Sequence, residues 1–300
     1  MAETTRKTTR LRRLIEDPAI LVMPGAYDVI SAKIIEETGY RAVQVSGANV
    51  AACHYGVPDY SLVSLREMVE QSGRIANAID IPAMGDADTG YGNAVNAWYT
   101  VRAFEDAGLA GINIEDQVMP KRCGHLDGKT LLPFDEAVAK VAAAADARRD
   151  ADFVINARTD ALGVHGIDEA VRRGNAFLDA GATMVFVEGA NSVENIRAAV
   201  QGIRGPVAVN LVEGGKSPQA MSFAELEVLG VARVSLPSTA MQAVVKALRT
   251  VFARQMADGR IGGYGDLLAG FGVAQRLVGR DRIDALERKY LAPLLAGEDR

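Results

Sequence analysis

The chain has 300 residues, 49% of them hydrophobic, and a formal net charge of −5. This size suits one large α/β domain with an appendage or two ordinary domains, and the negative charge argues against nucleic acid as a partner. No apolar run approaches the roughly 18 residues of a membrane span, and residues 1–13 lack the apolar core of a secretory signal, so we expect a cytoplasmic protein. Two cysteines, Cys53 and Cys123, predict thiols rather than a disulfide framework.

Apolar segments that predict buried strands alternate with helical patterns along the whole chain. Four of these segments follow a glycine that ends a helical pattern, at Gly39, Gly108, Gly181 and Gly230. The other four are residues 20–24, 81–86, 153–158 and 206–211. Eight strands separated by helices predict a (β/α)8 barrel of the TIM type. A doubly wound sheet is the alternative, but it would more naturally show a glycine-rich phosphate turn where this chain reads P-G-A-Y-D.

Helical patterns also predict how the barrel is covered and where it ends. Val95, Trp98, Val101 and Phe104 form one apolar stripe, which we expect to pack against the strands. We expect residues 1–258 to form the barrel with an N-terminal helix. Residues 259–300 continue as an apolar helical extension, which needs a partner surface and predicts oligomerisation.

Polar residues follow seven of the eight predicted strands. In TIM barrels the chemistry lies at the carboxyl ends of the strands, where these residues would meet. Each of them alone could cap a helix, but a convergence from seven strands predicts a functional site. The residues are Ser46, Gly47, Ala48, Asp86, Asp88, Glu115, Asp116, Arg158, Asp160, Glu188, Asn210, Ser235 and Ser238.

Four of these acids, Asp86, Asp88, Glu115 and Glu188, form an oxygen-rich set without a histidine cluster. Hard oxygen ligands suit Mg²⁺, with Mn²⁺ as an alternative, and disfavour zinc. The D-A-D motif alone is a weak signal because adjacent acids also cap helices, but its place at a strand end strengthens it.

The segment from Gln117 to Pro133 is long for a connection after a strand, which is typical of lids and binding loops. It places Cys123 and His125 among Lys121, Arg122 and Lys129, and such cations lower a thiol pKa and attract anions. Cationic surface loops are common, and Cys123 could instead be a passive small hydrophobe. Cys53 lacks such neighbours, and we interpret it as structural.

These motifs resemble those of the isocitrate lyase and phosphoenolpyruvate mutase superfamily, in its 2-methylisocitrate lyase and 2,3-dimethylmalate lyase-like branch. The resemblance covers residues 10 to 292. It rests on P-G-A-Y-D (24–28), V-S-G-A (45–48), D-A-D-T-G-Y-G-N (86–93), I-E-D-Q (114–117), K-R-C-G-H (121–125), A-R-T-D (157–160), E-G (188–189) and N-L-V-E-G-G-K-S-P (210–218). K-R-C-G-H following E-D-Q is the most specific of them.

The resemblance implies a role for each matching position. The first carboxylate of the substrate would bind at Ser46, Gly47 and Ala48, and the second at Asn210 and Ser238 with Gly124 and His125 of a closed lid. Asp86 and Asp88 would hold Mg²⁺ directly or through water, and Glu115 and Glu188 would order its waters. Asp59 would be a further active-site acid, Arg158 an anion clamp, and Lys121, Cys123 and His125 the catalytic groups of the lid.

The implied reaction is retro-aldol cleavage of a 2-hydroxy dicarboxylate or tricarboxylate to pyruvate and a second carboxylate, with Cys123 protonating the carbanion. The lid motif also suits carboxyphosphonoenolpyruvate mutases, and oxaloacetate hydrolases remain an alternative, although they place a serine where this chain has Pro237. Phe186 could pack against a substrate methyl group or belong to the barrel core. The resemblance further implies a homotetramer that exchanges C-terminal helices between subunits.

Overall fold

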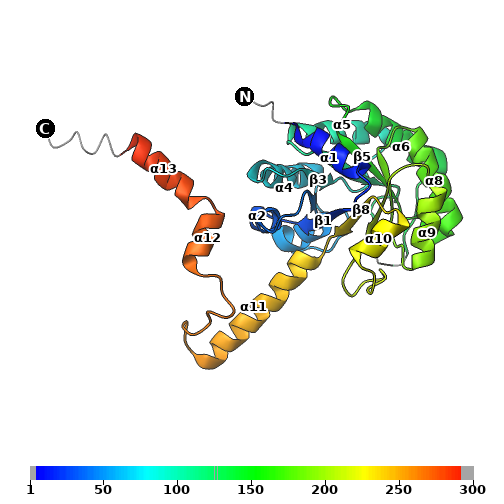
Figure 1. Cartoon of the computed structure of the whole chain (residues 1–300). Helices are drawn as coiled ribbons and strands as arrows, with labels where there is room; N and C mark the ends of the chain where they lie inside the picture. Colours follow the sequence, from blue (N-terminus) through cyan, green and yellow to red (C-terminus); the bar gives the residue numbers. More distant parts are fainter. Residues whose placement is uncertain (1–4, 125, 127, 292–300) are drawn as a thin grey trace. The chain divides into compact units, whose positions relative to one another are not determined.

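Eight parallel strands close into a barrel in chain order, with β8 paired to β1 (Figure 1). The computed structural model describes residues 5–124, 126 and 128–291. The strands are β1 (Leu21–Ala26), β2 (Val43–Val45), β3 (Ala83–Asp86), β4 (Gly111–Glu115), β5 (Val154–Thr159), β6 (Met184–Val187), β7 (Val207–Asn210) and β8 (Arg233–Leu236). The predicted (β/α)8 fold is therefore confirmed.

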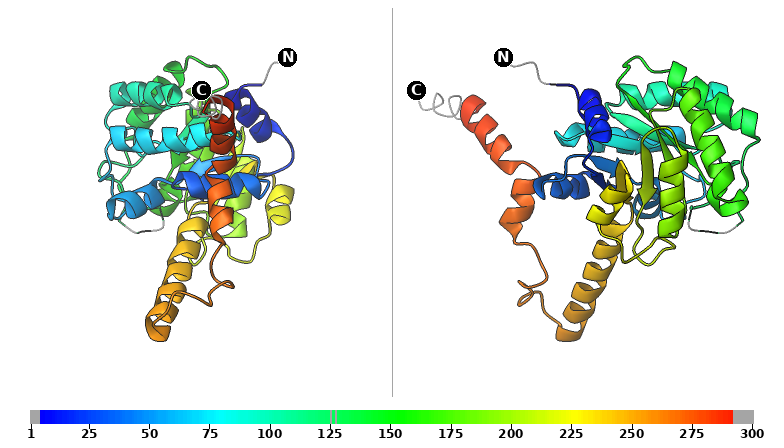
Figure 2. Two further views of the ribbon diagram at one scale, coloured as in Figure 1. Left: turned by 90° about the vertical axis from the view of Figure 1, so that its left-hand side faces the viewer. Right: turned by 45° about the vertical axis from the view of Figure 1, so that its right-hand side comes forward.

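Helices surround the strands on the outside of the barrel (Figure 2). They are α1 (Lys7–Glu16), α2 (Val29–Glu37), α3 (Gly47–Val50), the π-helical turn η1 (Ala51–Tyr55), α4 (Leu65–Ala78), α5 (Ala94–Asp106), α6 (Phe134–Asp146), α7 (Ala161–His165), α8 (Ile167–Asp179), α9 (Val193–Gly202) and α10 (Phe223–Leu229). The four predicted stop glycines have φ between 88° and 101°, a conformation that favours glycine.

Two sequence interpretations of single residues were wrong. On α5, Val101 and Phe104 are fully buried, but Val95 is 65% exposed because the helix turns its first residues toward solvent. Cys53, interpreted as structural, lies on η1 and is exposed. Neither error affects the barrel, since both residues lie on its outer surface.

The amino-terminal end of the barrel is closed by α1. Leu11 and Ile15 of this helix are buried in one cluster with Leu21, Ala42 and Ala110, which stand at the beginnings of strands or just before them. Above them the same cluster continues into the barrel interior. This apolar plug closes the amino-terminal end, so within the described residues the barrel opens at its carboxyl end.

The chain separates into two compact units, Met1–Met241 and Gln242–Arg300. The helix α11 (Thr239–Asp258) begins at the end of the first unit, and α12 (Phe271–Leu277) and α13 (Arg280–Tyr290) follow in the second. Many apolar side chains of the second unit are exposed, among them Phe252, Met256, Ile261 and Phe271. No helix within the described residues has both the length and the apolar character needed to cross a membrane.

Candidate active site

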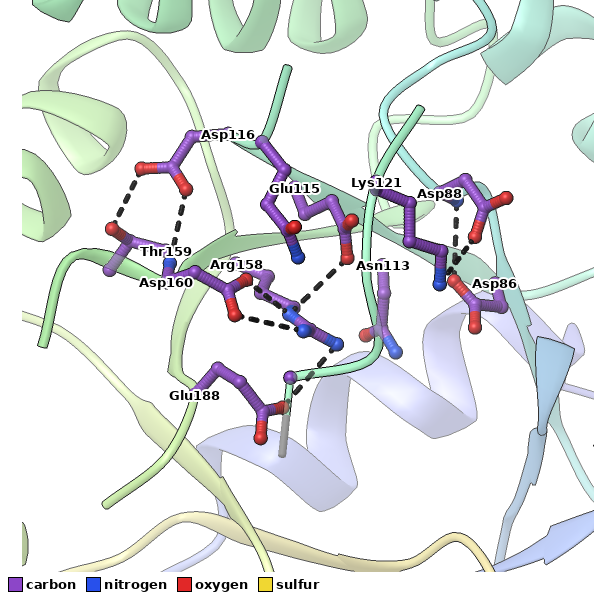
Figure 3. A network of polar contacts seen from close by, with 12 residues as sticks. Asp86, Asp88, Asn113, Glu115, Asp116, Lys121, Arg158, Thr159, Asp160 and Glu188 are labelled. Carbon is purple, nitrogen blue, oxygen red and sulfur yellow. Dashed lines mark hydrogen bonds and ion pairs between the residues drawn. The ribbon is translucent and has the colours of Figure 1, made fainter. Parts of the chain in front are cut away.

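Arg158 of β5 stands at the centre of a group of carboxylates at the carboxyl end of the barrel (Figure 3). Its Nε lies 3.3 Å from Oε2 of Glu115, the last residue of β4, and its Nη1 lies 3.3 Å from Oε2 of Glu188, which follows β6. Asp160 fixes the plane of the guanidinium through two bonds, at 2.8 Å from Nε and 3.1 Å from Nη2. Phe186 packs under it, with the guanidinium 5.3 Å from the ring centre, and is 2% exposed, as a core residue is.

Lys121 holds a second group of carboxylates. Its Nζ lies 2.6 Å from Oδ1 of Asp59 and 3.0 Å from Oδ1 of Asp88, and its side chain is 2% exposed. Burial alone would lower the pKa of Lys121, but the carboxylates of Asp88, Glu115 and Asp59 raise it well above its usual value. The ammonium therefore stays charged and ties the lid segment to the loop after β3.

The predicted lid is folded down onto these two groups. Its ends are joined by a bridge between Gln117 and Leu131, and the Gln117 side chain pairs with the backbone of Arg122. Lys129 donates through Nζ to the carbonyl oxygen of Gly124 at 2.6 Å and to Asp160 Oδ1 at 2.8 Å. Two lysines, one near each end of the loop, thus fasten the lid to buried carboxylates.

Gly124 brings the lid backbone into direct contact with the central arginine. A Cβ at this position would clash with the Glu188 side chain and would lie 2.6 Å from Arg158 Nη2. Cys123 directly precedes Gly124 in the chain, and its side chain is half-buried. His125, a predicted catalytic and substrate-binding residue, lies outside the described residues.

Gly47, the first residue of α3, makes a similar close approach to Asp86 of β3. Its backbone N–H donates to Asp86 Oδ2 at 3.2 Å, and a Cβ there would lie 2.5 Å from the same oxygen. Ser46 caps α3, because its side-chain oxygen accepts from the Asn49 N–H at 3.4 Å. The helix therefore begins at Gly47, next to Asp86 of β3. Ala48 lies one residue further into α3 and is partly buried.

The predicted second carboxylate site is only partly assembled. Asn210 donates to Glu188 Oε2 at 3.1 Å, and its amide oxygen accepts from the hydroxyl of Ser235. Ser238 lies two residues beyond β8 and forms no hydrogen bond to this group within the described part of the chain. Beside Gly124 and Lys129, a cavity of about 440 Å³ extends toward Lys216.

Sequence reasoning placed Asp116 and Asp160 at strand ends but missed Thr159 and Arg173, which support them behind the site. Asp116 accepts from the Thr159 hydroxyl at 2.7 Å, from the Asp160 N–H at 3.0 Å and from Arg173 Nη1 at 3.1 Å. These bonds fix the loop that carries Asp160, which in turn orients Arg158. Arg173 lies on α8, far along the chain, so no local motif announces it.

Carboxylates outnumber cations at this end of the barrel among the described residues. The acids are Asp59, Asp86, Asp88, Glu115, Asp160 and Glu188, against Lys121, Lys129 and Arg158. Burial raises the pKa of Asp88 to about 6, although Lys121 opposes the rise. Burial likewise raises the pKa of Glu115 well above its usual value. The excess negative charge calls for a further cation.

The donor set fits a hard divalent cation that keeps several waters. Glu115 Oε1 is buried and has no hydrogen-bond partner in the described structure, so one carboxylate oxygen remains to be satisfied. No group of three or more Asp, Glu, His or Cys side chains in residues 5–124, 126 and 128–291 is placed to hold a metal ion by itself. Mg²⁺ needs only one or two carboxylates besides water and substrate, so Asp86 and Asp88 would suffice.

We expect the stability of the metal-free protein to fall between about pH 4 and pH 6, and Asp88→Asn to remove most of this fall. Because burial raises the pKa of Asp88 to about 6, the folded chain retains a proton between about pH 4 and pH 6 that the unfolded chain releases. Its stabilising contribution is present below pH 4 and is lost as the pH rises to about 6. Urea unfolding in EDTA at several pH values measures this.

The exposed Asp179, paired with Arg204 on the surface, supplies the control. Asp179→Asn should follow the wild-type pH dependence, whereas Asp88→Asn should flatten it. Parallel curves for wild type and Asp88→Asn between pH 4 and pH 7 would contradict the expectation.

Comparison with known proteins identifies relatives of the whole chain. The family model for phosphoenolpyruvate phosphomutase matches residues 11–256. The chain is 39% identical over 281 residues to 2,3-dimethylmalate lyase of Eubacterium barkeri, covering 94% of this chain and 97% of that one. It is 45% identical over 241 residues to a probable 2-methylisocitrate lyase of Corynebacterium glutamicum, covering 79% and 77%.

Solved structures agree with these sequence relatives. A crystal structure of 2,3-dimethylmalate lyase superposes with a TM-score of 0.90 at 35% identity, covering 98% of this chain and 99% of the other. A phosphonopyruvate hydrolase in complex with oxalate and Mg²⁺ superposes with a TM-score of 0.87 at 35% identity, covering 96% and 100%.

Proposed function

Because this chain belongs to the phosphoenolpyruvate mutase and isocitrate lyase superfamily, whose relatives include lyases and mutases, we propose that it is a Mg²⁺-dependent carbon–carbon lyase. Its substrate would be a 2-hydroxy dicarboxylate or tricarboxylate, cleaved to pyruvate and a second carboxylate. The observation that carries the proposal is the cluster of buried carboxylates and cations at the carboxyl end of the barrel, under a lid that contains Cys123.

The metal would be held by Asp86 and Asp88, with Glu115 Oε1 accepting from a bound water. When bound, Mg²⁺ supplies Lewis-acid chemistry to the carboxylate and the 2-hydroxyl of the substrate. Lys121 would then share the carboxylate of Asp88 with the cation, since its ammonium already contacts Oδ1. The remaining contact to Asp59 at 2.6 Å keeps the lid fastened.

Residues of the chain would bind and orient the anionic groups. The N–H of Gly47, at the start of α3, donates to Asp86 Oδ2, and a substrate carboxylate would bind at this end of the helix, beside Ser46, Gly47 and Ala48. Arg158, held in plane by Asp160, offsets negative charge that develops on the departing carboxylate. The cavity beside Gly124 and Lys129 has room for the distal arm of the substrate.

Cys123 would donate the proton that completes the reaction. A base in the site first takes the proton of the 2-hydroxyl. The oxygen then forms the carbonyl group of pyruvate as the bond between C2 and C3 breaks, and the electron pair of that bond stays on C3, the carbon of the departing carboxylate. The thiol transfers its proton to that carbon, and solvent later restores the thiol. Lid closure by Lys121 and Lys129 would exclude water at this stage, so the carbanion is protonated by the protein.

A panel of candidate substrates tests this proposal. Purified protein with Mg²⁺ is supplied with 2-methylisocitrate, 2,3-dimethylmalate, isocitrate or oxaloacetate, and pyruvate, glyoxylate or oxalate is followed continuously. We expect pyruvate from a methylated acid, abolished by EDTA. Oxalate from oxaloacetate would instead favour the hydrolase alternative. If folded, metal-loaded protein releases no product from any of these acids, a carboxyphosphonoenolpyruvate mutase would be favoured.

We also propose that the protein is a homotetramer whose second unit is covered by neighbouring copies. Met256 and Ile261 are 88% and 92% exposed, and Phe252 and Phe271 are also largely exposed, so this apolar surface needs a partner. Sedimentation equilibrium should give the mass of four chains, and Phe271→Asp should shift the population toward smaller species. A wild-type profile of monomer alone would contradict the proposal.

A further inference from the structure

Arg233 is a fully buried charge inside the barrel. It lies on β8, its side chain is 0% exposed, and it reaches across the interior to three other strands. Nη2 donates to Gln44 Oε1 at 2.6 Å, Nη1 lies 3.5 Å from Asn113 Oδ1, and Nε lies 3.1 Å from the sulfur of Met23. All three partners are neutral, and among the described residues no carboxylate forms an ion pair with this guanidinium.

The partners of Arg233 form a polar layer beneath the mouth of the barrel. Asn156 donates to Asn113 at 2.7 Å, and Gln44 donates to the backbone carbonyl groups of Val45 and Met84. Asn113 on β4 is the register neighbour of Asp86 on β3, so this layer directly adjoins the proposed metal residue. Interior layers of TIM barrels are usually filled by branched apolar side chains, so a charged layer is unusual.

A buried guanidinium without a counter-ion does not stabilise a fold. Removing its hydration costs several kcal/mol, which three neutral partners offset only in part. Consistently, burial lowers the pKa of Arg233 to about 9, and the carboxylate of Asp86 is the one charge that opposes the shift. The through-space partner of Arg233 is thus a residue of the proposed site, which links the buried charge to function.

We propose that Arg233 is a positioning residue for the proposed lyase reaction, supplying a fixed positive potential beneath Asp86 that favours bound anions at the mouth of the barrel. This inference rests on the proposed function, because the anion is the substrate and the alkoxide or enolate formed from it. The potential acts oppositely on the two ligands. It attracts the anionic substrate and slightly repels the divalent cation.

Binding measurements on the full-length protein test this proposal without turnover. Two titrations are made. In the first, oxalate, a dianion that resembles the enolate of pyruvate, is titrated at saturating Mg²⁺. In the second, Mg²⁺ is titrated alone. Arg233→Met removes the charge but keeps a long side chain, and we expect its Kd for oxalate to rise on the order of tenfold. Its Kd for Mg²⁺ alone should stay unchanged or fall, and its melting temperature should stay equal or rise.

Two matched variants separate charge from packing. Arg233→Lys keeps the charge and should retain most of the oxalate affinity. Gln44→Met breaks the same hydrogen-bond network and keeps the charge, so it should lower the melting temperature while leaving oxalate affinity within about threefold.

Two outcomes would overturn the inference. Oxalate binding to Arg233→Met that equals the wild type would show that the charge does not act on the anion. Parallel weakening of oxalate and Mg²⁺ binding with a lower melting temperature would show a purely structural role. Wild-type protein that binds neither probe would instead refute the proposed function and, with it, this inference.

Discussion

Cys123→Ser is expected to lower kcat by about two to four orders of magnitude while KM changes by no more than about threefold. The serine hydroxyl has nearly the same size, so the lid can still close over Arg158 and Glu188. It is a far weaker acid than a thiol, and transfer of its proton to the carbanion is correspondingly slower. Steady-state kinetics on the substrate identified by the panel measures both parameters.

Cys53→Ser is the matched control for this prediction. Cys53 is exposed on η1, outside the polar groups at the barrel mouth, so its replacement should leave kcat unchanged. Equal losses in the two variants, or a Cys123→Ser enzyme with normal kcat and a raised KM, would contradict a role for Cys123 as proton donor.

Gly124→Ala is expected to lower kcat/KM by about a hundredfold or more, because the lid can no longer close. A methyl group at this position clashes with Glu188 and lies 2.6 Å from Arg158 Nη2, and both side chains are fixed by buried ion pairs. Kinetics gives the loss of activity. Limited trypsin digestion reports on the lid itself, because the loop contains Lys121, Arg122 and Lys129.

Gly163→Ala supplies a control for the lid on the wall of the same cavity. A methyl group there would meet only the end of Lys129, at an ordinary contact distance of 3.6 Å. With Mg²⁺ and oxalate bound, this variant should keep wild-type resistance to trypsin. Gly124→Ala should be cut faster under the same conditions. Equal protection of both variants would show that lid closure does not depend on Gly124.

The barrel could be predicted from sequence because its signals are local. Glycines such as Gly108 end helices by their backbone conformation, and each is followed at once by an apolar strand. Val95 was placed wrongly because periodicity fixes the stripe of a helix but not how far the stripe extends toward its first turn. Its 65% exposure is set by where α5 begins relative to the strands.

The location of the site could be predicted from the sequence, but the pairing of its cations with its carboxylates could not. Asp86, Glu115, Arg158 and Glu188 meet because parallel strands end at one edge of the barrel. Which cation faces which carboxylate depends on loop paths, so the contacts of Lys121 with Asp59 and Asp88 came only from the structure. The buried arginine of β8 escaped notice because a single charge in an apolar strand resembles an exposed strand position.

Cleavage of 2,3-dimethylmalate or 2-methylisocitrate in D₂O with Mg²⁺ would test the central claim most directly. A lyase that breaks the bond between C2 and C3 and protonates the carbanion should release pyruvate together with an equal amount of propionate or succinate carrying one deuterium. The product ratio and the isotope content follow from mass spectrometry of a single reaction. Absence of pyruvate from both acids, with oxalate and Mg²⁺ still binding, would contradict the lyase account.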